Sequence, residues 1–502
     1  MELPLLQQAR SHRDRTAVIA KDGTFTYEEL LDASECRAAH LLGSRTDLEE
    51  ARVAFLVPPS FEYVATQWGI WRAGGVAVPL AVSHPATELR YVIADADASV
   101  IITHPDLEET ARDAIDSPQR HLVSTKEFGD PAHATLPALD KERRAMMVYT
   151  SGTTGKPRGV VTTHANINAQ VTSLIDAWEW RQDDHILLAL PLHHVHGIIA
   201  VLTCAMWAGA CCEMLPDFDA AEVWNRFEKS RPTVFMAVPT IYRRLIDVWE
   251  DATAERRQSM SDACRRMRLH VSGSAALPVP VLERWRAVTG HTLLERYGMT
   301  EIGMGLTNPL HGKRTPGHVG TPFPGVEVRL MDDNGREPSP GSPGEIEARG
   351  PNVFLEYWRR PDETASAFRD GWFATGDIAV VEDGGYRLLG RKSVDIINTA
   401  GYKVSALEIE EALRSHPSID ECAVVGVADP DLGERVCAAV ELGSNDELTI
   451  ETLREWARDR LAPYKIPRDL RVAELPRNAM GKVMKVEVAA LFHEGRKDGR
   501  TE

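Results

Sequence analysis

Apolar runs that end in proline, glycine or serine recur along the first 300 residues. They include RVAFLVPP (52–59), HILLALPL (185–192), TVFMAVP (233–239) and MRLHVSGS (267–274). Between such runs lie stretches with helical spacing, and one of them, FEYVATQWGIWRAGG (61–75), ends at paired glycines. Because buried strands that alternate with helices build parallel sheets, the pattern predicts an α/β fold.

The pattern changes twice further along the chain. From about residue 315 to 390, short strands are separated by Gly, Pro and Asp, which predicts an antiparallel β-rich subdomain. After Gly390 two amphipathic helical stretches (405–417 and 449–462) flank two apolar strands, which indicates a small α+β unit. We therefore expect a large N-terminal domain at 1–390 and a small C-terminal domain at 391–502.

Length and composition fit this division. A chain of 502 residues is too long for one core, and 43% hydrophobic with 26% charged residues is typical of a soluble globular protein. No secretory signal is visible, and the seven cysteines contain no C-x-x-C pair, so we expect reduced thiols and a cytoplasmic location.

The net charge is −17, which argues against nucleic acid and an anionic membrane as partners. If the substrates are anions, the protein has to gather positive charge locally. Lysines and arginines within glycine-rich segments are therefore the best candidates for binding an anionic substrate.

One such segment is VYTSGTTGKPRGV (148–160). Hydroxyl groups can donate to phosphate oxygens, glycines let the backbone approach an oxyanion, and a lysine adds a point charge. The alternative is a polar turn between a strand and a helix. The residues that would bind phosphate are Thr150, Ser151, Gly152, Thr153, Thr154, Gly155 and Lys156.

YTSGTTGKPRG resembles the signature of the adenylate-forming superfamily, which contains acyl-CoA synthetases, luciferases and the adenylation domains of peptide synthetases. Six more segments resemble the other motifs of this superfamily, in the same order: LPLHHVHG (190–197), VSGSAALP (271–278), ERYGMTE (295–301), TGD (375–377), GRKSVDIINTAGYKVSALEIE (390–410) and PRNAMGKVMK (476–485). The resemblance implies ATP, Mg²⁺ and coenzyme A as substrates and cofactors, and a mobile C-terminal domain.

The resemblance also implies the roles of individual residues. Thr300 would contact the α-phosphate, Glu301 would hold Mg²⁺, Lys482 would bridge carboxylate and phosphate, and His194 would lie beside the acyl pocket. Besides the loop at 150–156, the residues that would bind the nucleotide are Ser272, Gly273, Ser274, Ala275, Glu295, Arg296, Tyr297, Gly298, Met299, Asp377 and Arg391.

In this superfamily a carboxylate attacks the α-phosphate of ATP, and a thiol then attacks the acyl-adenylate. Between the two steps the C-terminal domain rotates, and Gly401, Tyr402 and Lys403 would then face coenzyme A. Relatives usually carry Lys-Thr-Gly-Gly before this Tyr-Lys pair, whereas this chain has Asn-Thr-Ala-Gly at 398–401, which questions the efficiency of the thiol step. The hinge residue is Lys392, Ser393 or Val394.

Several segments resemble the malonyl-CoA synthetase branch in particular, which implies a short pocket with a positive charge for a small dicarboxylic acid. The residues expected around this pocket are His194, His196, Thr203, Arg268 and Met304. Arg268 is the expected receptor of the free carboxylate, and its alternative role is an ion pair with a surface acid. Two other functions stay open: a different short-chain or aryl acyl-CoA synthetase, and a stand-alone enzyme that loads a carrier protein.

Overall fold

The computed structural model describes residues 2–129, 135–150, 156–399, 402–443, 447–477 and 483–492. Some residues that the sequence analysis singled out lie outside these ranges: Ser151, Gly152, Thr153, Thr154, Gly155, Ala400, Gly401 and Lys482. In the described part of the chain, no helix combines the length and apolarity that a membrane span requires.

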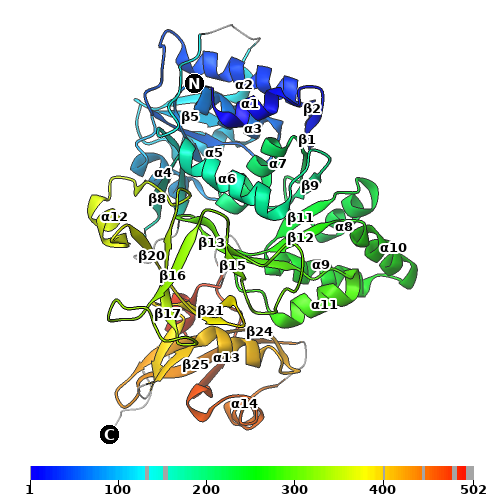
Figure 1. Ribbon diagram of the computed structural model, residues 1–502, viewed down its shortest axis with the longest axis vertical. Coiled ribbons are helices and arrows are strands. Elements are labelled where there is room, and N and C mark those ends of the chain that lie inside the picture. The colour runs from blue at the N-terminus through cyan, green and yellow to red at the C-terminus, as the bar shows by residue number, and fades with distance from the viewer. Residues whose placement is uncertain are drawn as a thin grey trace.

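The N-terminal part contains two largely parallel sheets (Figure 1). The first has the order β18-β8-β7-β4-β3-β5-β6, in which β4, β3, β5, β6 and β7 are parallel and β8 and β18 are antiparallel. Its strands are β3 (Arg52–Leu56), β4 (Val76–Pro79), β5 (Val100–Thr103), β6 (His121–Ser124), β7 (Arg144–Thr150), β8 (Arg158–Thr163) and β18 (Glu356–Tyr357).

The second sheet has nine strands in the order β15-β14-β13-β12-β11-β9-β10-β1-β2, and it is parallel from β1 to β13. Its strands are β1 (Thr16–Ala20), β2 (Gly23–Thr26), β9 (His185–Leu188), β10 (Cys211–Met214), β11 (Val234–Ala237), β12 (Leu269–Ser272), β13 (Leu294–Met299), β14 (Gly303–Thr307) and β15 (Thr321–Pro322). The apolar runs of the sequence thus form the central strands, as predicted.

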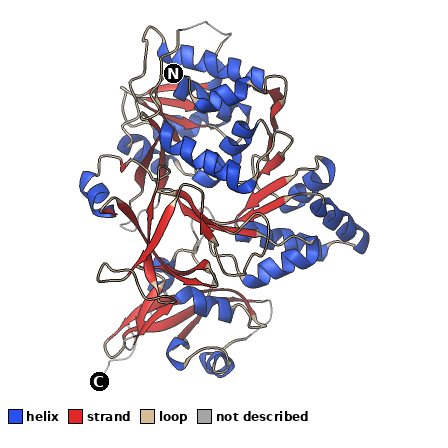
Figure 2. Cartoon of the chain, in the orientation of Figure 1, coloured by secondary structure: helices blue, strands red, loops and turns tan. Residues whose placement is uncertain are grey.

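Helices pack on the faces of both sheets, and some of them lie between the two sheets (Figure 2). They are α1 (Pro4–Arg10), α2 (Tyr27–Leu42), α3 (Phe61–Arg72), α4 (Ala86–Asp95), α5 (Glu108–Ala114), α6 (His164–Trp178), α7 (Cys204–Ala208), α8 (Ala220–Lys229), α9 (Pro239–Asp251), α10 (Ala254–Arg265) and α11 (Val279–Thr289). One core joins the two sheets and includes Phe55, Trp68, Leu187 and Met236. Since burial of such side chains contributes about 1.5–3 kcal/mol each, this core holds the two sheets in a fixed relation.

The β-rich subdomain is antiparallel, as the turn residues predicted. Asp383 and Gly384 both have positive φ between the paired residues Glu382 and Gly385, the conformation of a two-residue hairpin turn. Its elements are β16 (Glu327–Met331), β17 (Gly344–Arg349), α12 (Pro361–Ala367), β19 (Phe368–Arg369), β20 (Trp372–Glu382) and β21 (Gly385–Arg391).

The chain then enters a separate five-stranded sheet with its own apolar core, at the opposite end of the molecule from the N-terminus (Figure 1). Ser405 and Thr449 cap its first two helices through their hydroxyl groups. The elements are β22 (Ile396–Thr399), β23 (Tyr402–Ser405), α13 (Ala406–Leu413), β24 (Ile419–Asp429), β25 (Gly433–Leu442), α14 (Ile450–Ala457), β26 (Asp469–Val472) and α15 (Lys485–Ala490). This is the α+β unit that the sequence predicts.

Candidate active site

The predicted site residues gather where strands β7, β12 and β13 end. β12 and β13 are parallel neighbours, with Ser272 opposite Glu295, so the segments that follow them lie at one edge of the sheet. In open α/β sheets this carboxyl edge is where ligands bind. Gly273, Ser274 and Ala275 follow β12, Glu295 to Met299 form most of β13, and Thr300 and Glu301 follow it. Thr150 ends β7, and Lys156 comes before β8.

Glu301 connects the two sheets. Its Oε1 accepts hydrogen bonds from the Tyr357 hydroxyl at 2.8 Å and from Arg158 Nη2 at 3.4 Å. Arg158 also lies 3.8 Å from the centre of the Tyr357 ring and forms an ion pair with Glu363 at 3.2 Å. No described residue donates to Glu301 Oε2, so this oxygen is the one that could bind a cation.

Asp377 and Arg391, the two residues assigned to the ribose, are paired across β20 and β21. Arg391 Nε lies 3.1 Å from Asp377 Oδ1, and the Tyr297 hydroxyl donates to Asp377 Oδ2 at 2.6 Å. Burial raises the pKa of Tyr297 well above its usual range, so the hydroxyl keeps its proton and remains a donor. The structure thus joins Tyr297 to the two residues that were expected beside the ribose.

His196 is buried and His194 is half-buried, and the Nε2 atom of each is buried without a hydrogen-bond partner among the described residues. His196 begins a π-helix, His196–Thr203, a form that is frequent at functional sites. Burial lowers the pKa of His194 to about 4 and that of His196 well below its usual value. Both rings are therefore neutral at neutral pH and cannot supply the positive charge of the pocket.

Two other residues expected around the acyl pocket are buried near this helix and strand β14. The Thr203 hydroxyl donates to the carbonyl of Ile198 at 2.7 Å, so it is occupied by its own helix. Met304 lies on β14, and its backbone N–H donates to Gln170 Oε1 at 2.8 Å. These residues can shape the pocket, whereas the charge has to come from elsewhere.

Arg296 is the buried cation of this region, with only 2% of its surface exposed. Among the described residues its Nε has no partner, and the one hydrogen bond of its side chain runs from Nη2 to Ser274 Oγ at 3.5 Å. Burial lowers its pKa to about 9, so it remains charged at neutral pH. Ser274 Oγ also lies 3.2 Å from His196 Nδ1, and a Cβ at Gly273 would lie 2.6 Å from Arg296 Cζ. A larger residue at position 273 would therefore push the guanidinium away from its place beneath the loop.

Glu295 precedes Arg296 and points to the other face of β13, because side chains alternate along a strand. Its Oε1 accepts from the backbone N–H of Leu277 at 3.1 Å, and its Oε2 is buried without a partner. Burial raises its pKa to about 8, so it is mainly protonated at neutral pH and does not neutralise Arg296.

The assignment of Arg268 to substrate recognition is wrong. Its Nε and Nη2 contact the two carboxylate oxygens of Asp184 at 2.7 and 2.5 Å, and its Nη1 donates to the carbonyl of Trp178 at 2.9 Å. Arg268 comes directly before β12, whereas the site lies where β12 ends. It is therefore at the opposite edge of the sheet, in an ion pair, although its partner Asp184 is buried and is not the surface acid of the alternative role.

Tyr402 and Lys403, expected to face coenzyme A, lie on β23. The ring of Tyr402 is 53% exposed and stacks on Tyr464 with centroids 4.3 Å apart. Lys403 forms an ion pair with Asp333, in the turn between β16 and β17, which also binds Lys392 at 3.0 Å.

Sequence reasoning missed Arg158 and Tyr357. Arg158 stands within GKPRG and could have been found by the same argument that selected Lys156, a cation in a glycine-rich segment. Tyr357 lies 56 residues from Glu301 along the chain and has no local signal.

The fold and the site define an ATP-using ligase of the adenylate-forming class. Residues 5–358 match the family described as AMP-binding enzyme, and residues 408–482 match the AMP-binding enzyme C-terminal domain. The chain belongs to this family.

Among its relatives, the chain is 47% identical to a mitochondrial malonate–CoA ligase of Mus musculus, over 97% of this chain and 90% of that one. It is 43% identical to a malonate–CoA ligase of Arabidopsis thaliana, over 96% and 87%. The crystal structure of ATP-bound MatB from Rhodopseudomonas palustris superposes with a TM-score of 0.88 at 32% identity, covering 98% of this chain and 99% of that one. Apo MatB from the same organism gives 0.78 at the same coverage and identity, so this chain is arranged more like the ATP-bound form.

The corrected role of Arg268 leads to a first prediction. Arg268→Ala leaves the nearly inaccessible Asp184 carboxylate without its partner, and we expect a loss of about 2–4 kcal/mol in the free energy of unfolding, measured with urea. The preference for dicarboxylates over monocarboxylates should not change. The matched control is Arg265→Ala, because Arg265 pairs with Asp262 on the surface and should contribute within about 0.5 kcal/mol. A selective loss of dicarboxylate turnover in Arg268→Ala would restore its original assignment.

Proposed function

We propose that this enzyme activates malonate as malonyl-adenylate and transfers the malonyl group to coenzyme A, releasing pyrophosphate and AMP. The observation that carries this proposal is Arg296, a buried guanidinium with no carboxylate partner among the described residues, between the nucleotide loop and the His196–Thr203 helix. The named activity of the curated relatives supports it.

The charge of Arg296 explains why the substrate would be a diacid. Burying a cation without a partner costs several kcal/mol, and a carboxylate that binds two guanidinium N–H groups can offset this cost. One carboxylate of malonate has to reach the α-phosphate, which the resemblance places at Thr300. Arg296 and Thr300 are four residues apart, which corresponds to about 13 Å of extended strand. Malonate is shorter than this, so it can contact both positions only where the long side chain of Arg296 extends toward Thr300. The nearby His196, which is neutral, can contribute a hydrogen bond without adding charge.

The reaction consists of two displacements. A malonate carboxylate oxygen attacks the α-phosphorus of ATP and pyrophosphate leaves; the thiol of coenzyme A then attacks the acyl carbon and AMP leaves. The chain contributes orientation and charge: Thr300 at the α-phosphate, Lys482 near the transferred oxygen, and Asp377 with Arg391 at the ribose.

We also propose Mg²⁺ as the cation at Glu301. Mg²⁺ would neutralise the charge that develops on the phosphates. It usually takes one or two carboxylates besides phosphate and water, and Glu301 offers one free oxygen.

The seven cysteines are free thiols in the structure, and five of them are buried. This supports the reducing, cytoplasmic location that we propose for the protein.

The alternatives make different demands on Arg296. A monocarboxylic or aryl acid would leave its charge unpaired in a closed pocket, which disfavours them. A panel of malonate, methylmalonate, succinate, acetate, butyrate and coumarate, assayed for AMP release with ATP, Mg²⁺ and coenzyme A, identifies the acid. Replacing coenzyme A by a carrier protein identifies the acceptor. Higher turnover of butyrate or coumarate than of malonate would refute the proposal.

Arg296→Leu should lower kcat/KM for malonate on the order of 10²-fold or more, since the distal carboxylate would lose its only cation. Butyrate should be used equally well or better in the apolar pocket. Arg296→Lys keeps the charge but loses the planar guanidinium. Its kcat/KM for malonate should lie between the values of the unaltered enzyme and of Arg296→Leu. If kcat/KM for malonate and for butyrate decrease by the same factor, Arg296 supports the fold and does not recognise the substrate.

Tyr357→Phe should raise the Mg²⁺ concentration that gives half-maximal adenylation several-fold, with kcat at saturating Mg²⁺ largely kept. The reason is that Glu301 Oε1 loses its 2.8 Å hydrogen bond and the carboxylate is less well oriented. Tyr386→Phe is the control, because its hydroxyl donates to the carbonyl of Val328, away from Glu301. Identical Mg²⁺ titrations for the Tyr357 variant and the unaltered enzyme would contradict this role.

Lys482→Ala should slow malonate-dependent pyrophosphate exchange on the order of 10²-fold, because a charge donor to the transition state is lost. Thiolation of supplied malonyl-adenylate should be spared, since a different face of the C-terminal domain serves that step. If both half-reactions fall by the same factor, Lys482 has no step-specific role.

A further inference from the structure

Helix α4 is hydrogen-bonded to both flanks of the segment at 150–156, whose residues were expected to bind phosphate. After this segment, the carbonyl of Pro157 accepts from the Tyr91 hydroxyl at 2.7 Å. Before it, the Tyr149 hydroxyl donates to Asp95 Oδ2 at 2.8 Å. Tyr91 and Asp95 are four residues apart on α4 and therefore lie on one face of the helix. We call these two hydrogen bonds the α4 anchors.

Asp95 is in an unfavourable place for a carboxylate, because it ends α4, where the free carbonyls of a helix already carry partial negative charge. Its charge is compensated from outside the helix. Arg360 Nη2 donates to Asp95 Oδ1 at 2.7 Å, and Trp358 Nε1 donates to the backbone carbonyl of Asp95 at 3.1 Å. Burial raises the pKa of Tyr149, so its hydroxyl keeps the proton that it donates to Oδ2. Both carboxylate oxygens thus join α4 to other segments of the chain.

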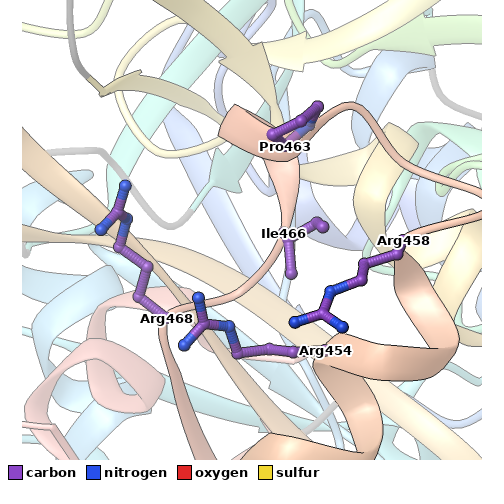
Figure 3. A pocket seen from close by; sticks show the side chains of 5 residues that line it. All are labelled: Arg454, Arg458, Pro463, Ile466 and Arg468. Carbon is purple, nitrogen blue, oxygen red and sulfur yellow. The ribbon is translucent and has the colours of Figure 1, made fainter.

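Arg360 extends this network to the proposed cation site. Its Nε lies 3.6 Å from Glu363 Oε1, and Glu363 pairs with Arg158, which also contacts Glu301. In the C-terminal domain, by contrast, a cavity of about 310 Å³ is lined by three arginines (Figure 3): Arg454, Arg458 and Arg468. Since Arg360 is engaged with two carboxylates, its charge orients groups of the protein and is not presented to a ligand.

The α4 anchors limit where Thr150 and Lys156 can lie. Tyr149 precedes the first of them and Pro157 follows the second, and consecutive Cα atoms are about 3.8 Å apart, so a residue next to a fixed one can move little. Pro157 adds to this effect because its ring fixes its own φ angle. The ladder between β7 and β8 already pairs Tyr149 with Gly159. The strands are therefore held together without α4, and the anchors set their position relative to the helix.

We propose that Tyr91 and Asp95 are positioning residues for the segment that binds the β- and γ-phosphates of ATP. They hold Thr150 and Lys156 where these side chains can reach the two phosphates. This inference rests on the proposed function, in which the same two phosphates leave as pyrophosphate. AMP lacks both groups, and so does the acyl-adenylate that the thiol attacks. The α4 anchors should therefore affect the binding of ATP, but neither the binding of AMP nor the thiol step.

The test compares Tyr91→Phe, Tyr149→Phe and the double variant, which lose hydroxyl groups and keep the rings. Affinities for ATP and AMP are measured by calorimetry with Mg²⁺ and without a carboxylic acid, so that no adenylate forms. Each single variant should bind ATP about fivefold more weakly, as for loss of one hydrogen bond, and the double variant more weakly still. The affinity for AMP and the rate of thiolation of supplied acyl-adenylate should not change.

Asp95→Asn and Asp97→Asn form a matched pair. Asp97 also binds two arginines, Arg52 at 2.9 Å and Arg359 at 2.7 Å, but both lie outside β7 and β8. In Asp95→Asn an amide replaces one acceptor oxygen, so either the arginine or the tyrosine loses its acceptor. Only this variant should bind ATP more weakly.

An equal loss of affinity for ATP and AMP, or an unchanged affinity for ATP in the double variant, would overturn the proposal. An equal effect of Asp97→Asn would overturn it too. Lys156→Ala tests the proposed function separately. If this variant binds ATP as tightly as the unaltered enzyme, the assignment of phosphate to residues 150–156 has failed, and the inference fails with it. If it binds ATP more weakly and the α4 variants do not, only the inference has failed.

Discussion

A guanidinium group enclosed by protein has to be paired with an anion, and the side chain of Arg296 finds none among the described residues. The elements around it are arranged so that this charge persists. The loop after β12 approaches closely because residue 273 is a glycine, and Ser274 shares its hydroxyl between Arg296 and His196. Desolvation keeps the neighbouring histidines neutral, and Glu295 turns to the other face of β13. The pocket thus concentrates its positive charge in one group, and a substrate with a second carboxylate completes it.

The same principle separates the arginines that bind ligands from those that support the fold. Arg268 and Arg158 are cations beside functional segments, but each is committed to a carboxylate, Asp184 or Glu301. Arg296 lacks such a partner among the described residues. In a strongly acidic chain, an unpaired cation is costly to maintain and indicates an anionic ligand. This uncompensated charge would select the acid.

Sequence was sufficient for the features that depend on local order along the chain. Apolar runs predicted the central strands, whereas Ser274, Thr300 and Glu301 were assigned through the resemblance to family motifs. The structure places these residues directly after β12 and β13. The prediction for Arg268 failed because a residue before a strand lies at the opposite edge from a residue after it. Its partner, Asp184, is 84 residues away along the chain and has no local signal. The π-helix and the contact of Tyr357 with Glu301 likewise arise from tertiary packing, which periodicity does not encode.

The contacts of Asp333 show how the C-terminal domain can be held and still be released. This carboxylate pairs both with Lys392, a candidate hinge residue, and with Lys403, one of the residues expected to face coenzyme A. The two lysines lower the pKa of Asp333 to about 2, so the pairs are formed at any physiological pH. All three side chains are about half exposed or more, and ion pairs of this kind contribute roughly 0–1 kcal/mol each. That is enough to bias the domain toward the orientation seen here, and small enough to permit the domain rotation that the resemblance implies. Because exposed pairs are screened by salt, the same contacts would make the balance between the two half-reactions sensitive to ionic strength.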